Sequence, residues 1–297
     1  MTWENCTVTL NSDSTGRVYA GDVVTGTVTL EFAKEKFIEN VDFQILGFGE
    51  AQWTRSKPTA PYIKICSEKK KLLHINMDVF GNTFRRVINP GIYNFPFHFA
   101  LPGDLPSTFE SSIAKVYYYI KIEMKGMFKP KKTVPFIVFG NVNLNHIEEF
   151  LDPTTHIFQK ICWNSKYLSV SLKTYEGFAS KQNIPLRLRI KNEEKVIINK
   201  IKVYLIQKLQ YSISDGYTAE ERNLYHVEFN KISNTTSETC NFSMDVPCVP
   251  PSTLYTTDAM IIISYVLRVE VIFLFHSTLR QDIPVTIATV PVIHNEF

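Results

Sequence analysis

Few side chains in this sequence have the types and spacing that catalysis or metal binding requires. The seven histidines are scattered, and the five cysteines form no C-x-x-C pair. There is no glycine-rich phosphate loop, no G-x-S-x-G and no H-E-x-x-H. Cys240 and Cys248 flank one expected strand, but nothing basic lies near them to lower the pKa of a thiol. We therefore predict a non-enzymatic protein with no catalytic, cofactor-binding or metal-binding residue.

Two lysine clusters are the stronger candidates for function. The first ends an expected loop, residues 55–71, and the second lies in an expected hairpin tip, residues 125–132. The clustered residues are Lys69, Lys70, Lys71, Lys129, Lys131 and Lys132. Such clusters can attract acidic peptides or anionic lipid, at about 1 kcal/mol per basic residue near a charged membrane surface. Lysines also occupy solvated turns or guard sheet edges against aggregation, and both interpretations stay open at this stage.

The composition is that of a globular protein with a modest positive charge. Apolar residues make up 44% of the chain, which is enough to fill hydrophobic cores, and 21% of the residues are charged and can cover a surface. A net charge of +3 without a basic stripe argues against nucleic-acid binding. The odd number of cysteines and the lack of a signal-peptide pattern at the amino terminus favour a reducing, cytoplasmic location.

Alternating apolar and polar residues predict β-strands throughout the chain, and no window shows sustained helical periodicity. In the apolar run 259–275, Leu267 belongs to one strand face while Arg268 and Glu270 belong to the other. Charges at a bilayer centre cost several kcal/mol, so we interpret this run as a buried strand rather than a membrane span. By the same alternation, Ile120 is predicted to face a core and Lys121 to face outward.

The sequence contains one strand-rich unit twice. The block Tyr118–Glu123 is matched by Tyr265–Glu270 at an offset of 147, and Phe97–Pro102 is matched by Phe242–Pro247 at an offset of 145. Two further blocks, one upstream and one downstream, match in the same order at offsets of 160 and 149. Copies of this length indicate a domain duplication rather than a solenoid, whose repeats are much shorter.

The pattern predicts an all-β protein of two tandem immunoglobulin-like antiparallel β-sandwiches. We place the first domain at residues 1–140 and the second at residues 162–297. The intervening residues 141–161 lack clear alternation and carry several asparagines and an Asp-Pro pair, so they are predicted to be a linker.

Motifs in the first half of the chain resemble those of arrestin-domain-containing proteins, the α-arrestins. They are V-Y-A-G-D-V-V-T-G-T-V at residues 18–28, G-E-A-Q-W at residues 49–53, and F-P-F-H-F-A-L-P-G-D-L-P-S-T-F-E at residues 95–110. The last is similar to the family signature F-P-F-x-F-x-L-P-x-x-L-P-S-[ST]-F-E. The second half is similar to the arrestin carboxy-terminal domain at residues 183–192, 201–211 and 250–267. The resemblance spans nearly the whole chain and implies the arrestin fold.

The resemblance implies a non-enzymatic adaptor that binds cytoplasmic regions of membrane receptors or transporters. Such an adaptor couples its cargo to endocytic sorting, ubiquitination or signalling, and is a cytoplasmic protein recruited to the plasma membrane and endosomes. Many α-arrestins recruit HECT-type ubiquitin ligases through P-P-x-Y motifs in a tail. This sequence contains none, so that partner is expected only if a tail absent here exists. Two alternatives stay open: a coat subunit like the arrestin-fold subunit of retromer, and a redox regulator that binds thioredoxin through a cysteine.

Three local features refine these expectations. Pro58, Thr59, Ala60 and Pro61 spell the late-domain motif P-T-A-P, which recruits the sorting machinery of multivesicular bodies, although a proline-rich loop can also spell it by chance. Ser180-Lys181 stands where the family usually has a glycine and an acid, so we expect that turn to differ locally. The first strand, residues 7–10, lacks the paired lysines of visual and β-arrestins, which argues against phosphate-gated activation.

Overall fold

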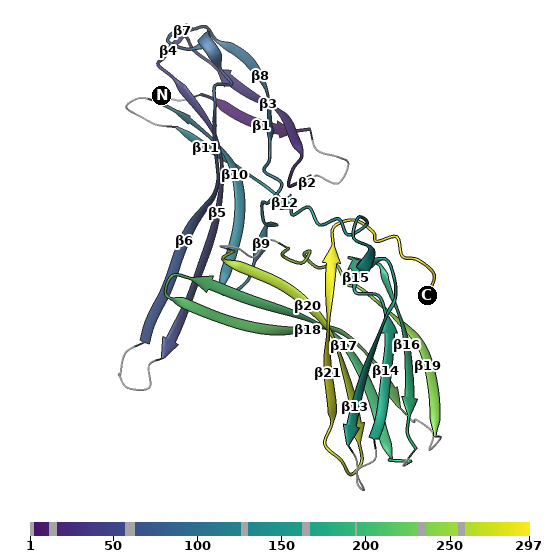
Figure 1. Ribbon diagram of the computed structural model, residues 1–297. Helices are drawn as coiled ribbons and strands as arrows, with labels where there is room; N and C mark the ends of the chain where they lie inside the picture. Colours follow the sequence, from purple (N-terminus) through teal and green to yellow (C-terminus); the bar gives the residue numbers. More distant parts are fainter. Residues whose placement is uncertain are drawn as a thin grey trace. The chain divides into compact units, whose positions relative to one another are not determined.

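The computed structural model describes residues 3–11, 17–56, 63–125, 130–161, 167–193, 195–230, 236–254 and 259–297. Within these ranges the chain forms β-strands and two short 3-10 helices, so the expected all-β fold is confirmed (Figure 1). The chain divides into two compact units: unit 1 is Met1–Asn141 with Ile213–Gly216, and unit 2 is Val142–Ser212 with Tyr217–Phe297.

Unit 1 is an antiparallel sandwich. Its elements are β1 (Asn5–Leu10), β2 (Val18–Tyr19), β3 (Val23–Phe32), β4 (Lys36–Ile38), β5 (Val41–Ser56), β6 (Ile63–Met77), η1 (Gly81–Thr83), β7 (Arg86–Ile88), β8 (Gly91–Ala100), β9 (Phe109–Glu110), β10 (Ala114–Met124), β11 (Lys131–Phe136) and β12 (Val138–Phe139). One sheet has the order β1-β3-β8, and the other has the order β11-β10-β5-β6 with β9 also paired to β10. The rings of Phe43 on β5 and Phe97 on β8 lie 4.9 Å apart, so these two sheets bury their facing sides against each other.

Unit 2 also contains two larger sheets. Its elements are η2 (Glu148–Phe150), β13 (Thr154–Ile161), β14 (Tyr167–Thr174), β15 (Gly177–Ala179), β16 (Asn183–Lys191), β17 (Ile198–Ile213), β18 (Gly216–Asn230), β19 (Ser237–Asp245), β20 (Ile261–Phe273) and β21 (Leu279–Ala288). The strand orders are β13-β14-β16-β19 and β15-β21-β20-β17-β18. β15 and β21 run parallel, and the other strand pairs of unit 2 with a described register run antiparallel.

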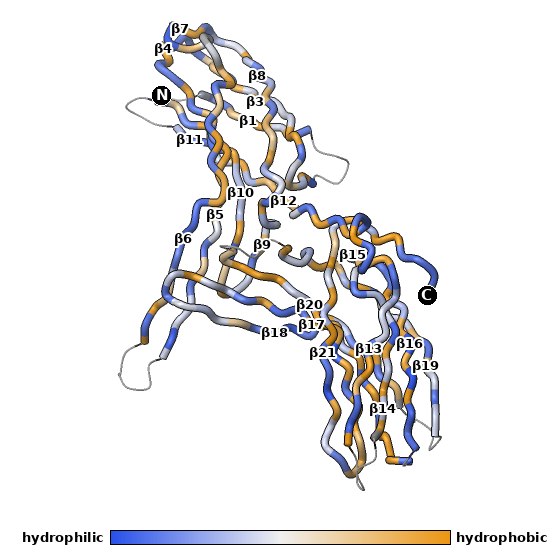
Figure 2. Tube along the Cα trace, viewed as in Figure 1, coloured by the Kyte–Doolittle hydropathy of each residue, from blue (hydrophilic) through white to orange (hydrophobic). Residues whose placement is uncertain are grey.

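The alternation that predicts the strands also places the cores. Figure 2 shows hydrophobic and hydrophilic residues alternating along many of the strands. Ile120 in β10 and Leu267 in β20 are fully buried, whereas Lys121 and Arg268 beside them are only half-buried. The predicted faces of both strands are therefore confirmed. The apolar run 259–275 contains β20, and none of the described residues forms a helix that is long and apolar enough to span a membrane.

The duplication extends to single hydrogen bonds. The hydroxyl of Tyr118 donates to the backbone oxygen of Pro106 at 2.7 Å, and the hydroxyl of Tyr265 donates to that of Pro250 at 2.6 Å. Burial raises the pKa of both phenols, so both remain protonated donors. In each unit this bond ties a central strand to the connection that precedes it in the sequence.

The turn at Ser180-Lys181 keeps the backbone geometry of its counterpart in unit 1. In the first turn the backbone amide of Asp22 donates to the oxygen of Tyr19, and in the second the amide of Gln182 donates to the oxygen of Ala179, both at 3.1 Å. Gly21 has a φ of 90° in the first turn, and Lys181 has a φ of 68° at the matching position of the second. The expected local difference is thus confined to the side chain. Lys181 adopts the left-handed conformation that glycine adopts without steric cost.

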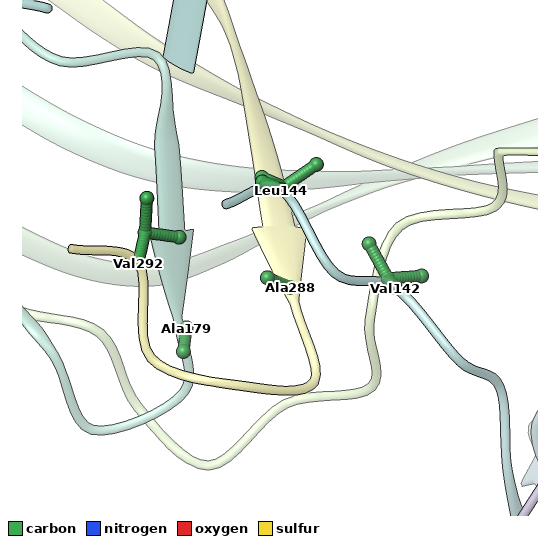
Figure 3. Close-up of a cluster of buried hydrophobic side chains, with 5 residues drawn as sticks. All are labelled: Val142, Leu144, Ala179, Ala288 and Val292. Carbon is green, nitrogen blue, oxygen red and sulfur yellow. The ribbon is translucent and has the colours of Figure 1, made fainter. Parts of the chain in front are cut away.

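The segment 141–161, expected to be a strand-free linker, is structured. It contains η2 and all of β13, which pairs with β14. Two of its apolar side chains belong to a buried cluster of unit 2 (Figure 3). The cluster consists of Val142, Leu144, Ala179, Ala288 and Val292. The expectation of a strand-free segment is wrong, because β13 buries only Phe158 fully and so shows little apolar alternation in the sequence. The domain boundaries themselves stay a prediction.

Candidate functional site

The two lysine clusters lie on one sheet of unit 1. Lys69, Lys70 and Lys71 lie within β6, and Lys131 and Lys132 begin β11. These strands are the opposite ends of the order β11-β10-β5-β6, about 14 Å apart at the usual strand spacing. Lys131 lies level with Glu123 and Lys69 lies level with Lys115, so the clusters are also about 27 Å apart along the strands. Lys129 and the P-T-A-P motif at residues 58–61 lie outside the described residues.

The first cluster is not in a loop. β5 continues to Ser56 and β6 begins at Ile63, so most of the expected loop 55–71 is strand. A register shift between Gly47 and Phe48 sets Lys71 opposite Phe48 and Lys69 opposite Glu50. The loop expectation is wrong because a run of charged residues conceals the alternation of the strand. Their cross-strand partners supply the stabilisation that apolar side chains usually give.

Alternation divides the lysines between two faces of the sheet. Lys69 and Lys71 share the outer face, which points away from the sheet β1-β3-β8, while Lys70 lies on the other face and is half-buried. Lys131 pairs with Glu123 on the outer face, whereas Lys132 pairs with the buried Ile122. We call the outer surface the lysine–aromatic face. It comprises Phe48, Glu50, Lys69, Lys71, Lys115, Tyr117, Tyr119 and Lys131.

Glu50 links three strands of this face. Its carboxylate lies 2.5 Å from the ammonium of Lys69 on β6 and 2.9 Å from that of Lys115 on β10. The hydroxyl of Tyr117 donates to the same carboxylate at 2.5 Å. The bonds from Lys69 and Tyr117 hold the pKa of Glu50 at about 2, and the same contact raises the pKa of Lys69. Both partners are therefore charged at neutral pH.

An aromatic ladder runs beside this network. The ring of Tyr119 is stacked 6.1 Å from those of Phe48 and Tyr117, and Phe48 and Tyr117 lie 5.9 Å apart. The ammonium of Lys69 lies 4.5 Å from the centre of the Phe48 ring, within the range of a cation–π contact. Half-buried aromatic rings on the face opposite the core offer flat apolar contact area next to fixed charges.

The face has positive charge that internal pairs do not neutralise. Glu50 is shared by Lys69 and Lys115, so one carboxylate serves two ammonium groups. In the described part of the chain, neither Lys71 nor Lys131 forms an ion pair. Beside Lys115 and Tyr117 lies a hollow that Thr108, Phe109, Glu110 and Val116 complete. The arrangement can thus attract an acidic ligand and contact an apolar side chain.

Sequence reasoning found the lysines and missed their partners. Phe48, Glu50 and Lys115 were not expected to be functional, because no local spacing relates three residues on different strands. One signal was present in the sequence. Tyr117 and Tyr119 occupy positions of β10 that alternate with the core, where polar residues are usual. Aromatic residues at outward positions of an amphipathic strand are thus a detectable mark of such a face.

The surroundings of two cysteines disfavour the thiolate form. Burial raises the pKa of the Cys6 thiol to about 11, even though Lys132 acts in the opposite direction. Burial and the nearby Glu238 raise the pKa of Cys240, which disfavours the thiolate that redox exchange requires. Among the described residues, no three His, Cys, Asp or Glu side chains gather where they could hold a metal ion.

Comparison with known proteins places this sequence in a family. Residues 6–145 match the arrestin (or S-antigen) N-terminal domain, and residues 165–292 match the arrestin (or S-antigen) C-terminal domain. Arrestin domain-containing protein 4 of Mus musculus is 24% identical over 298 residues, which cover 94% of this chain and 70% of that protein. The human protein of the same name is 25% identical, with coverages of 92% and 68%.

A nematode relative shows the same extent of similarity. Arrestin domain-containing protein 17 of Caenorhabditis elegans is 21% identical over 301 residues, which cover 92% of this chain and 68% of that protein. Membership of this family supports an arrestin-like adaptor role for the chain. From its two matching domains and its all-β fold, the chain belongs to the arrestin family, within the arrestin domain-containing proteins or α-arrestins.

Proposed function

We propose that this protein is a cytoplasmic adaptor that binds acidic, extended segments of membrane receptors or transporters on its lysine–aromatic face. The observation that supports the proposal is the position of Lys69 and Lys71 on one outer face, beside a half-buried aromatic ladder. A face of this kind attracts negative charge and offers stacking area at the same time.

The edge strand β6 suggests how a peptide would bind. β6 ends its sheet in the described part of the chain and is 15 residues long. An extended peptide can add to such an edge through backbone hydrogen bonds, with alternate side chains falling on one face. Acidic residues at every second position of the peptide would then lie near Lys69 and Lys71. The residues between them would fall on the opposite face of the sheet, because neighbouring side chains of a strand alternate.

We propose further that binding couples the cargo to endocytic sorting, ubiquitination or signalling. In this proposal the protein is recruited from the cytoplasm to the plasma membrane and endosomes by its cargo. A HECT-type ubiquitin ligase would bind through a P-P-x-Y motif, and residues 1–297 contain none. The P-T-A-P motif at residues 58–61 is a proposed contact for the sorting machinery of multivesicular bodies.

The proposal is tested by the affinity of the protein for a panel of fluorescent peptides. We expect an extended peptide with alternating Glu and Leu to bind, and a Lys and Leu peptide of the same length not to bind. Lys71→Gln is expected to weaken binding about fivefold, because a surface charge near its ligand contributes about 1 kcal/mol. Lys70→Gln is the matched control, since it removes the same charge from the other face of β6. Equal losses from both variants would contradict the assignment of the face.

A further inference from the structure

The two larger sheets of unit 2 differ in how their cations are paired. In the sheet β15-β21-β20-β17-β18, every basic residue of β17, β20 and β21 forms an ion pair with a carboxylate. These residues are Lys200, Lys202, Lys208, Arg268 and Arg280. On the outer face of the sheet β13-β14-β16-β19, four basic side chains form no ion pair within the described part of the chain. They are Lys173, Arg187, Arg189 and Lys191.

The strand register places these four cations on one face. Lys173 on β14 lies directly opposite Arg187 on β16, and Arg189 and Lys191 follow at alternate positions of β16. Directly opposite residues of an antiparallel pair have side chains on the same face, as do alternate residues of one strand. Leu188, between the two arginines, is 0% exposed. The cations therefore point away from the core, and those of β16 extend over about 13 Å.

Negative charge on this face is confined to one corner. At the outward positions of the described parts of β13, β14, β16 and β19, the acidic residue is Asp245, which accepts a hydrogen bond from Asn183 at 2.8 Å. Asn183 is four residues from Arg187, about 13 Å along β16. The residue opposite Arg187 on β19 is the uncharged Asn241, whose amide oxygen accepts from the guanidinium at 3.1 Å. The middle of the face is therefore positive.

Two of the cations are also held in place by an aromatic ring. The ammonium of Lys173 and the guanidinium of Arg187 each lie 5.2 Å from the centre of the Phe297 ring. A cation–π contact orients a cation without neutralising its charge. Glu296, next to this ring, forms no ion pair among the described residues. Both cations therefore keep their charge for an external ligand.

One edge of the same face is apolar. β13 ends this sheet in the described part of the chain (Figure 1). Ile157 on β13 lies opposite Ser171, which lies opposite Arg189, so these three residues form one row on the face. Ile157 and Ile161, at alternate positions of β13, are 67% and 65% exposed. Two isoleucines thus lie two strands, about 10 Å, from the row of cations.

We propose that this basic face, formed by the four cations with Ile157 and Ile161, docks on an anionic lipid bilayer. Lipid head groups would neutralise the cations, and the isoleucines would enter the interface beside them. The position of the cations favours lipid over an extended peptide. β16 lies between β14 and β19, so its backbone is already paired and offers a peptide no strand edge. A layer of head groups needs no backbone pairing.

The expected contact is reversible and depends on salt. Exposed charges are screened over about 8 Å at physiological ionic strength, so binding should weaken as salt is added. Its effect becomes large once a second contact is made, because a tethered protein then meets the bilayer at a high effective concentration. The basic face belongs to unit 2 and the lysine–aromatic face to unit 1, so the inference goes beyond the proposed cargo binding.

Flotation of the full chain with vesicles tests the proposal. At low salt we expect binding to vesicles of phosphatidylcholine with about 30% phosphatidylserine, and little binding to pure phosphatidylcholine. Arg189→Gln with Lys191→Gln is expected to lower the partition coefficient about thirtyfold, because it removes two cations next to the head groups. Ile157→Ser is expected to lower it about fivefold by removing a partly inserted side chain. Thermal unfolding of each variant verifies that the fold is intact.

Matched controls separate the basic face from total charge. Lys202→Gln with Arg280→Gln removes the same charge from the other sheet and is expected to change the partition coefficient by less than about twofold. Arg189→Lys with Lys191→Arg keeps the charge and should keep the binding. As an independent measurement, the additional emission that Ile157→Trp gives over the wild type should shift to the blue and be quenched by brominated lipid.

Four outcomes would overturn the inference: no flotation of the wild-type protein, equal losses from the two pairs of Gln substitutions, an unquenched tryptophan at position 157, or unchanged vesicle binding in Arg189→Gln with Lys191→Gln. If that last variant instead lost affinity for the Glu and Leu peptide, the face would be a peptide site. Retained peptide binding with reduced flotation would show that the two surfaces act separately, as the inference requires.

Discussion

The contact between Lys69 and Glu50 gives a direct test of the strand register and of the outer face. We consider Lys69→Met, which keeps much of the length of the side chain and removes its charge. The change deletes the ion pair with Glu50, the bond to the hydroxyl of Tyr117 and the cation–π contact with Phe48. Glu50 keeps its contacts with Lys115 and Tyr117, so its charge is not left without a partner.

The magnitude follows from the exposure of the pair. The side chain of Lys69 is 54% exposed and that of Glu50 is 25% exposed, so solvent screens much of the attraction. Exposed ion pairs contribute about 0.2–1 kcal/mol, and hydrogen bonds to charged groups about 1.5–3 kcal/mol when they are well shielded. We therefore expect a loss of about 1 kcal/mol, and at most about 2. For a unit of this size that loss corresponds to about 2–6 °C in the melting temperature.

The pH dependence of the effect identifies its cause. Glu50 has a pKa of about 2 in the folded protein against an ordinary value of 4.5, so its contacts stabilise the fold fully above pH 4.5. That contribution is lost as the pH falls from 4.5 through about 2, because a protonated carboxyl no longer attracts Lys69. The difference in stability between wild type and Lys69→Met should therefore be full at pH 7 and should shrink as the pH falls through this window.

Urea unfolding of both proteins at pH 7 and at pH 3 measures this difference. Lys71→Met is the control, since Lys71 lies on the same face without an ion pair among the described residues, and its effect should stay below about 0.5 kcal/mol. Equal losses at positions 69 and 71, or a loss at position 69 that does not depend on pH, would refute the reasoning.

Had Lys69, Lys70 and Lys71 been in a loop, replacing all three lysines with Glu would leave the stability of unit 1 unchanged. In the strand, that change places a carboxylate against Glu50 and should destabilise unit 1.

Three further changes test the fold. Ile120→Asp should unfold unit 1, because an unpaired buried charge costs several kcal/mol. Lys121→Asp should be far milder. Circular dichroism measures both variants, and an equal loss of strand signal would disprove the register. Lys181→Gly should raise the stability of unit 2 by about 0.5–1 kcal/mol in urea unfolding, since glycine adopts a φ of 68° without strain; a loss would contradict the turn geometry. Gly26→Ala should destabilise unit 1 by about 1–3 kcal/mol, as its Cβ would lie 2.4 Å from a backbone oxygen of β1; an unchanged melting temperature would argue against this close approach.

The sequence by itself determined the strand character of most of the chain, the duplication, and the face of each residue in strands with clear alternation. These properties are local or repeated, because side chains on a strand alternate with a period of two residues whatever the strand pairs with. The core positions of Ile120 and Leu267 followed from that period alone. The family followed from motifs of the same kind, which are short and contiguous, and the matches over residues 6–145 and 165–292 agree with it.

The tertiary structure alone decided which residues meet. Glu50, Lys69 and Lys115 come from three strands, and only the pairing of β5 with both β6 and β10 unites them. The burial of Val142 likewise depends on side chains more than 30 residues away, so an asparagine-rich segment that looked like a linker became part of a core. Strand pairing is a long-range choice made by the whole hydrophobic core, and no window of the sequence contains the partners that decide it.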